Sequence, residues 1–116
     1  MPPAAPLLSV QLLAATDAWL LLRDSYPSRL NQGQGACGAG EEVFLRVLRL
    51  QPPKQTLQLK LASCWQNLEL DASAPGEGVW WDAAGQTLQV RWLPGSAPSR
   101  LSRRWRVGPD GAVQPQ

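Results

Sequence analysis

Several segments of this chain alternate strictly between apolar and polar residues, and this pattern limits the folds open to it. In Thr56-Leu57-Gln58-Leu59-Lys60-Leu61 every second residue is leucine, and polar residues stand between them. A strand with one buried and one solvated face has this period of two, whereas an amphipathic helix repeats every three or four residues. The same alternation recurs at 67–71, 87–92 and 104–107. It predicts half-buried antiparallel strands.

Turn-forming residues separate these segments at short intervals, as in all-β domains. They fall at 52–54, 74–78, 82–85, 94–99 and 108–111. We expect Val79–Trp81 to pair with Leu88–Trp92 across the turn at 82–85. In the same way, Arg103–Val107 should pair with Ala112–Gln114 across Gly108-Pro109-Asp110-Gly111.

Two further segments fit either a strand or a helix. Leu7–Asp24 is rich in Leu and Ala, and Glu41–Leu50 places apolar residues at both strand and helix spacing. We favour a strand for Glu41–Leu50, because Pro52-Pro53 leads from it directly into another strand. For Leu7–Asp24 we also favour strands over a helix. The predicted fold class is all-β: an antiparallel β-sandwich or small barrel of about seven or eight strands. One short N-terminal helix is the alternative.

The length of 116 residues suits one domain with a single core. We divide it into a Pro/Ala-rich tether at 1–6 and a β-rich domain at 7–116. The apolar stretch Leu7–Leu22 contains Gln11, Thr16 and Asp17, so it is too short and too polar to span a bilayer. No basic residue precedes it, which argues against an intact signal peptide. We expect a mature exported chain, with a cytosolic protein as the alternative.

Cys37 and Cys64 are the two cysteines of the chain. A disulfide between them would add about 3.5 kcal/mol of stability in the chain-entropy model. Two thiols buried as small hydrophobic groups are the alternative. Two cysteines without histidine cannot supply the four ligands of a structural zinc site. A Cys37–Cys64 disulfide would indicate a periplasmic or secreted protein.

Catalytic chemistry has little support in this composition. The chain has no histidine, which excludes Ser–His and Cys–His nucleophilic pairs. The segment Gly33–Gly38 matches GxGxxG, but a loop precedes it and Glu41-Glu42 would repel a pyrophosphate. Six of the nine acidic residues, Asp17, Asp24, Glu41, Glu42, Asp71 and Asp82, could supply a carboxylate pair for glycoside chemistry, but the sequence places no two of them at the required separation. Most of the Asp residues border turns, where a structural role suffices. We therefore expect a protein that is not an enzyme and has no cofactor and no metal.

Tryptophan and arginine side chains are the candidates for a binding surface, because both residue types are enriched at interaction hot spots. Arg103, Arg104 and Arg106 surround Trp105, and on a strand Arg104 and Arg106 would face opposite to Arg103 and Trp105. The predicted binding residues are Trp65, Trp80, Trp81, Arg103, Arg104, Trp105 and Arg106.

These residues predict a binding module whose expected partner is another protein, of the inhibitor, immunity or envelope-assembly type. An anionic glycan is a second partner class. Two alternatives remain open at this point: a salt-sensitive binder of single-stranded nucleic acid on an OB-like barrel, and a carrier of a small apolar ligand.

Overall fold

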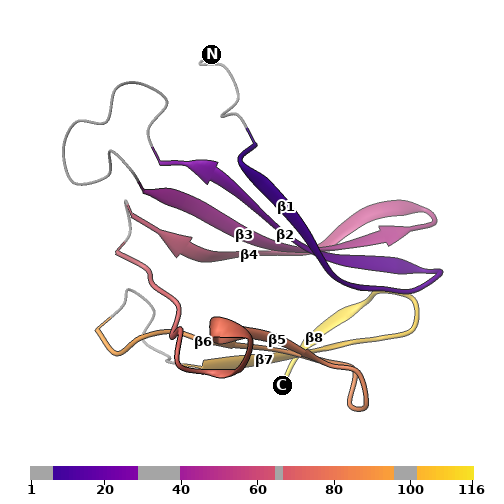
Figure 1. Cartoon of the computed structure of the whole chain (residues 1–116). Helices are drawn as coiled ribbons and strands as arrows, with labels where there is room; N and C mark the ends of the chain where they lie inside the picture. The colour runs from indigo at the N-terminus through magenta and orange to yellow at the C-terminus, as the bar shows by residue number, and fades with distance from the viewer. Residues whose placement is uncertain (1–6, 29–39, 65–66, 96–101) are drawn as a thin grey trace.

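The computed structural model describes residues 7–28, 40–64, 67–95 and 102–116, which form eight strands and one short 3-10 helix (Figure 1). The elements are β1 (Ser9–Ala15), β2 (Trp19–Pro27), β3 (Glu41–Leu50), β4 (Pro53–Ser63), η1 (Pro75–Gly78), β5 (Val79–Asp82), β6 (Thr87–Arg91), β7 (Ser102–Val107) and β8 (Val113–Pro115). No helix in these ranges has the length and apolarity needed to cross a membrane.

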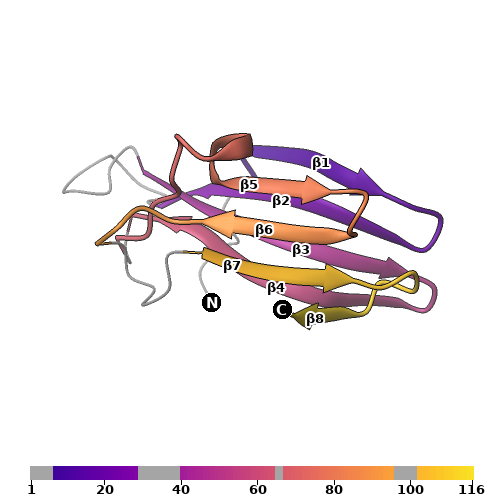
Figure 2. The same ribbon diagram turned by 90° about the horizontal axis from the view of Figure 1, so that it is seen from below.

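The strands form two antiparallel sheets, each built from strands that follow one another in sequence. One sheet has the order β1-β2-β3-β4 and the other the order β5-β6-β7-β8. The sheets lie face to face, and from below β5 lies near β1 while β8 lies near β4 (Figure 2). The all-β prediction is confirmed. Because every pairing between these strands stays within one sheet, the described chain forms a sandwich and not a closed barrel.

Alternate residues of each strand form the core between the sheets. In β3, Val43, Leu45 and Val47 are buried, and they belong to one hydrophobic cluster with Leu88 and Val90 of β6. A sandwich core of this kind is made by the inner faces of both sheets, and the residues between them face outward. The period of two in the sequence therefore defines both the core and the two outer faces.

Tryptophan side chains connect the two sheets. The ring of Trp19 on β2 meets the ring of Trp81 on β5 edge to face, with centroids 5.3 Å apart. Trp92, which follows β6, is 2% exposed, and its indole Nε1 donates a buried hydrogen bond of 2.9 Å to the carbonyl oxygen of Leu61 on β4. Buried indole N–H groups need such a partner, so this bond satisfies Trp92 and joins the sheets.

The turn between β7 and β8 also contacts the first sheet. Gly111 has a φ of 88°, a conformation that glycine adopts without steric cost. Its carbonyl oxygen accepts a 2.7 Å hydrogen bond from the hydroxyl of Thr56 on β4. The predicted reverse turn at 108–111 is confirmed, and β7 pairs with β8 across it as expected.

The structure decides the ambiguous segments. Leu7–Asp24 contributes two strands, and Glu41–Leu50 is the strand β3, so the predicted strands are confirmed and the helical alternative is wrong. The predicted pairing of 79–81 with 88–92 is present between β5 and β6.

The predicted strand at 67–71 is wrong. Asn67 has a φ of 51°, which interrupts the extended backbone immediately after β4. The segment instead makes two isolated bridges, one from Leu68 to Ser63 and one from Leu70 to Trp92. Leu68 and Leu70 nevertheless pack against the core, because the alternation of the sequence is retained without a continuous ladder.

Candidate binding face on the second sheet

The outer face of the β5–β8 sheet carries polar, aromatic and cationic side chains in register. Trp80 on β5 pairs with Gln89 on β6, which pairs in turn with Arg104 on β7. The backbone N–H of Gln116 donates to the carbonyl oxygen of Arg104 and extends this row. Because neighbouring strands lie about 4.8 Å apart, the row from Trp80 to Arg104 covers about 10 Å.

Two more arginines lie on the same face, one on each side of this row. Arg91 follows Gln89 by two positions and pairs with Ser102. Arg106 follows Arg104 by two positions and pairs with Thr87. Residues two apart on a strand share a face and lie about 6.7 Å from each other. The face therefore carries three arginines, on β6 and β7, beside the strand that holds Trp80.

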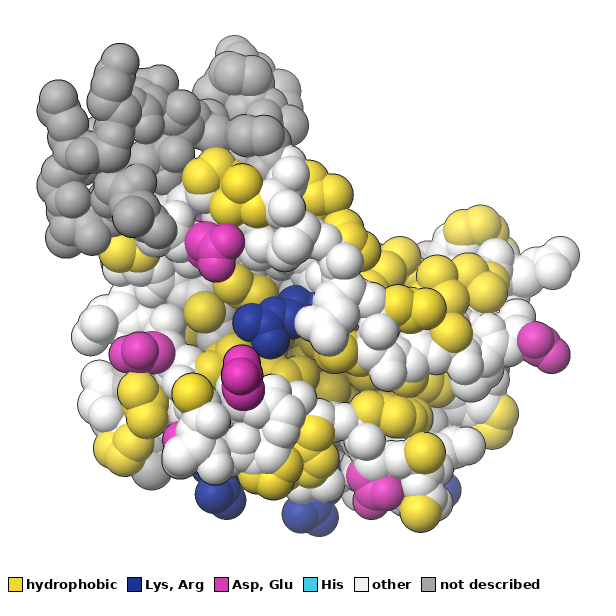
Figure 3. Space-filling model, in the orientation of Figure 1, with side chains coloured by type: hydrophobic (Ala, Val, Ile, Leu, Met, Phe, Trp, Pro, Cys, Tyr) yellow, Lys and Arg dark blue, Asp and Glu magenta, His cyan; other side chains and the backbone are white. Residues whose placement is uncertain are grey.

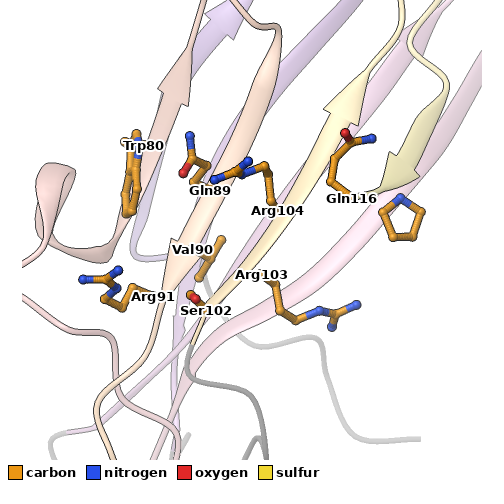
Figure 4. A pocket seen from close by; sticks show the side chains of 9 residues that line it. Trp80, Gln89, Val90, Arg91, Ser102, Arg103, Arg104 and Gln116 are labelled. Atoms are coloured by element: carbon orange, nitrogen blue, oxygen red, sulfur yellow. The ribbon is translucent and has the colours of Figure 1, made fainter.

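An open depression of about 280 Å³ lies on this face, between β5 and the C-terminal residues of the chain. Its lining comprises Trp80, Gln89, Val90, Arg91, Ser102, Arg103, Arg104, Pro115 and Gln116. Figure 4 shows the guanidinium group of Arg104 pointing toward Gln89, whereas the side chain of Arg103 points away from this row. We call Trp80, Gln89, Arg91, Arg104, Arg106 and Gln116 the arginine face.

The guanidinium groups of the arginine face have no carboxylate within ion-pair distance among the described residues. The two ion pairs of that part of the chain join Asp24 to Arg46 and Glu42 to Lys60, all on the first sheet. The carboxylate of Asp71 interacts with Arg91 only at longer range. Hydrogen bonds from Ser73 lower the pKa of Asp71 more than Arg91 does. Asp82 also lies on this face, two residues after Trp80 and in one row with Thr87 and Arg106, and Asp71 borders it beside Arg91. The three arginines therefore give the face an excess of positive charge but are not its only charged groups.

The predicted binding residues divide between this face and the core. Trp80, Arg104 and Arg106 lie on the arginine face. Trp105 does not, because it is 3% exposed and belongs to the hydrophobic core together with Val107. The inclusion of Trp105 in the predicted surface is corrected accordingly. The residues on either side of it, and not its ring, reach the solvent.

Two other predicted residues, Arg103 and Trp81, pack against tryptophan rings and do not belong to the arginine face. Arg103 is exposed, and its guanidinium carbon lies 4.6 Å from the centroid of the Trp105 ring, so it stacks on the rim of the core. Trp81 is half-buried and packs on Trp19 between the sheets, so it is not an outward-facing side chain. Trp65 and Cys37 lie outside the described residues.

The prediction missed Arg91, Gln89 and Gln116. A signal for Arg91 was present in the sequence, since Trp92 and Val90 are apolar and an arginine between them must face the opposite side of the strand. Gln116 carried no such signal, because its position depends on the pairing of a strand of three residues, β8.

The buried carboxylate of Asp24 and the partly buried carboxylate of Glu42 belong to networks on the first sheet. Glu42 accepts hydrogen bonds from the hydroxyls of Ser28 and Ser63, from the Nζ of Lys60 at 3.3 Å and from the backbone N–H of Cys64 at 3.1 Å. Burial alone would raise the pKa of Glu42, but these four donors outweigh it and lower the pKa below its ordinary value. Glu42 is thus held as a structural anion and is not poised for proton transfer at neutral pH.

Within the described ranges, no three side chains of the His, Cys, Asp or Glu type gather to form a metal-binding group. Comparison of the chain with protein-family models, with curated proteins and with solved structures gave no match in any of the three.

Proposed function

We propose that this chain is a non-enzymatic, exported binding module whose arginine face binds an acidic segment of a protein partner. The observation that carries the proposal is the grouping of Trp80, Arg91 and Arg104 at an open depression, with Arg106 two residues beyond Arg104 on the same face. Within the described residues, none of these arginines forms an ion pair. Trp and Arg are the side chains that most often dominate binding energy at protein interfaces. Guanidinium groups also bind carboxylates through two parallel hydrogen bonds.

The spacing of the face favours an extended acidic peptide. Alternate side chains of an extended chain lie about 6.7 Å apart, which equals the separation of Arg104 and Arg106 along β7. Gln89 and Gln116 can donate and accept hydrogen bonds beside them, as a polypeptide backbone requires. Trp80 adds an apolar surface at one end of the row.

Single-stranded nucleic acid is the weaker candidate. Its binding uses several aromatic rings on which successive bases stack. Of the described tryptophans, Trp80 faces outward on this sheet, whereas Trp81 and Trp105 pack inward. One ring with three arginines suits a peptide better than a row of bases.

Absence of catalysis is part of the proposal. The chain has no histidine, and the carboxylates of Asp24 and Glu42 each pair with a cation on the first sheet. Neither has the raised pKa that a general acid needs at neutral pH. Their ion pairs and lowered pKa values support a structural role for both carboxylates.

Export is proposed from the Cys37–Cys64 disulfide, which stays a prediction. A Cβ built on Gly40 would lie only 3.2 Å from the Sγ of Cys64, so residue 40 packs directly against that sulfur. The three residues from Cys37 to Gly40 span at most about 10 Å, which is compatible with the bond. Alkylation of the unfolded, unreduced protein should leave its intact mass unchanged. Addition of two alkyl groups would contradict the disulfide and remove the argument for export.

The binding proposal is tested with three labelled probes: an oligoglutamate peptide, a sulfated glycan and a single-stranded oligonucleotide. We expect the peptide to bind the wild type, and Arg104→Glu or Trp80→Ala to weaken this binding at least about tenfold, or 1.4 kcal/mol. Lys54→Glu is the matched control, because Lys54 is exposed on β4 of the other sheet and its replacement changes the charge equally. Fluorescence anisotropy measures the affinity of each protein for each of the three probes.

Capture from an extract of the source cell then identifies the partner. A protein retained by the wild type and by Lys54→Glu, and lost with Arg104→Glu, supports the proposal. If both variants lose the partner equally, the interaction depends on net charge alone and not on the arginine face, and the proposal is overturned. Stronger and steeply salt-dependent binding of the oligonucleotide would instead establish the nucleic-acid alternative.

A further inference from the structure

β1 is an edge strand that lacks the usual protection against pairing with another chain. Edge strands expose a row of backbone N–H and C=O groups, and proteins guard them with short length, proline or charge. β5 has four residues, β8 has three and ends in Pro115, and β4 carries Pro53, Lys54 and Lys60. By contrast, β1 has seven residues, and Leu7–Ala15 contains no charge, no proline and no glycine.

Exposed apolar side chains follow this edge. Leu8, Val10 and Leu12 are 52%, 55% and 57% exposed. They share a face by alternation, and Val10 pairs with Asp24, which pairs with Phe44 on the outer face of the first sheet. Figure 3 shows hydrophobic side chains gathered over this upper sheet, and Figure 2 shows β1 at its margin. Exposed apolar groups in such a row mark an interaction surface.

We propose that β1 pairs antiparallel with β1 of a second copy of this chain, about a twofold axis through Val10. The pairing of β1 with β2 is regular from Ser9 to Leu12, and its register shifts between Leu12 and Ala14. Together with Leu8, which precedes it, this regular stretch runs from Leu8 to Leu12, and Val10 is its central residue. In this register Val10 faces Val10 of the second copy, and Leu8 faces its Leu12. Ser9 faces Gln11. The β1–β4 sheet of one copy and the β1–β4 sheet of the other then form one continuous sheet across the axis.

A second copy fits this edge better than an unrelated strand for two reasons. Antiparallel pairing of a strand with itself is an isologous contact, which closes after two copies. The absence of charge in Leu7–Ala15 means that self-pairing places no like charges opposite each other, a condition that a charged edge fails. The three apolar residues also meet apolar residues directly.

The register gives a specific test by analytical ultracentrifugation of the full chain at about 1–500 µM and low salt. We expect the wild type to self-associate to a dimer. Val10→Lys places two lysines opposite each other on the axis and should raise the dimer Kd at least tenfold, as should Val10→Glu. An equimolar mixture of these two variants places Lys opposite Glu and should associate again as a heterodimer.

Leu50→Lys is the matched control, because Leu50 is 41% exposed on β3 and lies away from the edge. It should leave the dimer unchanged, and far-UV circular dichroism verifies that each variant is folded. A wild type that stays monomeric throughout would overturn the proposal, as would a dimer that persists in folded Val10→Lys. Failure of the mixture to associate would overturn the Val10 register. Arg104→Glu should not alter the dimer, so the two proposals fail independently.

Discussion

Replacement of Trp92 by alanine is expected to lower the free energy of unfolding by about 3–5 kcal/mol. The side chain is 2% exposed, and truncation leaves a cavity between the sheets. It also removes the hydrogen bond from the indole to the carbonyl oxygen of Leu61. Since domains of this size are stable by about 5–15 kcal/mol, this loss is a large fraction of the total. Urea unfolding followed by far-UV circular dichroism measures it without relying on tryptophan fluorescence.

Trp92→Phe separates the two contributions. Phenylalanine fills much of the space but donates no hydrogen bond, so we expect a smaller loss of about 1–3 kcal/mol. Trp80→Ala on the arginine face is the matched control and should cost less than about 1 kcal/mol, because Trp80 lies on the outer side of β5. A loss below 1.5 kcal/mol for Trp92→Ala would contradict its position in a packed core.

Arg46→Ala is the second substitution with a large expected effect. The Nε and Nη2 of Arg46 donate to the two carboxylate oxygens of Asp24 at 2.8 and 3.0 Å, and Asp24 is 3% exposed. Removal of the cation leaves a buried carboxylate without its charge partner, at a cost of about 3–5 kcal/mol. Chemical denaturation at pH 7 measures the loss. Arg49→Ala is the control, since the guanidinium of Arg49 donates to a backbone carbonyl oxygen and not to a carboxylate.

The pH dependence distinguishes this ion pair from simple packing. Burial alone would raise the pKa of Asp24, but hydrogen bonds from Arg46 and Tyr26 and the charge of Arg46 lower it below 3.8. The pair therefore stabilises the wild type fully above the unfolded pKa, and this contribution is lost as the pH falls through the folded pKa. In Arg46→Ala the pKa of Asp24 should rise, so protonation relieves the unpaired charge on acidification.

The difference in unfolding free energy between wild type and Arg46→Ala should consequently shrink from pH 7 toward pH 3. A difference independent of pH would show that lost packing on Phe44, not the charge of Asp24, causes the effect. If Arg46→Ala does not fold, the double variant Asp24→Leu/Arg46→Leu is informative. It should be more stable than the single variant, because it leaves no buried charge.

Most of the strand pattern was predictable, and the exceptions have physical causes. β4, β6 and β7 alternate cleanly because one face of each is apolar and the other polar. β2 lacks this signal, since Trp19 and Leu21 face the core while Leu20 and Leu22 face outward. A strand that is apolar on both faces, as β2 is over Trp19–Leu22, looks ambiguous in sequence. Sandwich and barrel could not be distinguished, because they differ in closure and not in local alternation.

The candidate site was predictable in composition but not in arrangement. The sequence indicated that Trp and Arg carry the binding, and it placed Arg104 and Arg106 on one face. It could not show that Trp105 shares the core with Val107, because the burial of a face depends on which sheet covers it. The edge formed by β1 was missed for a related reason. Whether a strand lies at the margin of a sheet is a property of the strand order.

The separation of the two sheets along the sequence has a consequence for synthesis of the chain. Residues 9–63 contain every strand of the first sheet, and residues 79–115 contain every strand of the second. During translation, the first sheet can form its hairpins while its partner is still inside the ribosome. Its core face, with Leu21, Leu45 and Leu61, then remains uncovered until β5–β8 emerge. The nascent chain thus carries an apolar face that a chaperone would recognise.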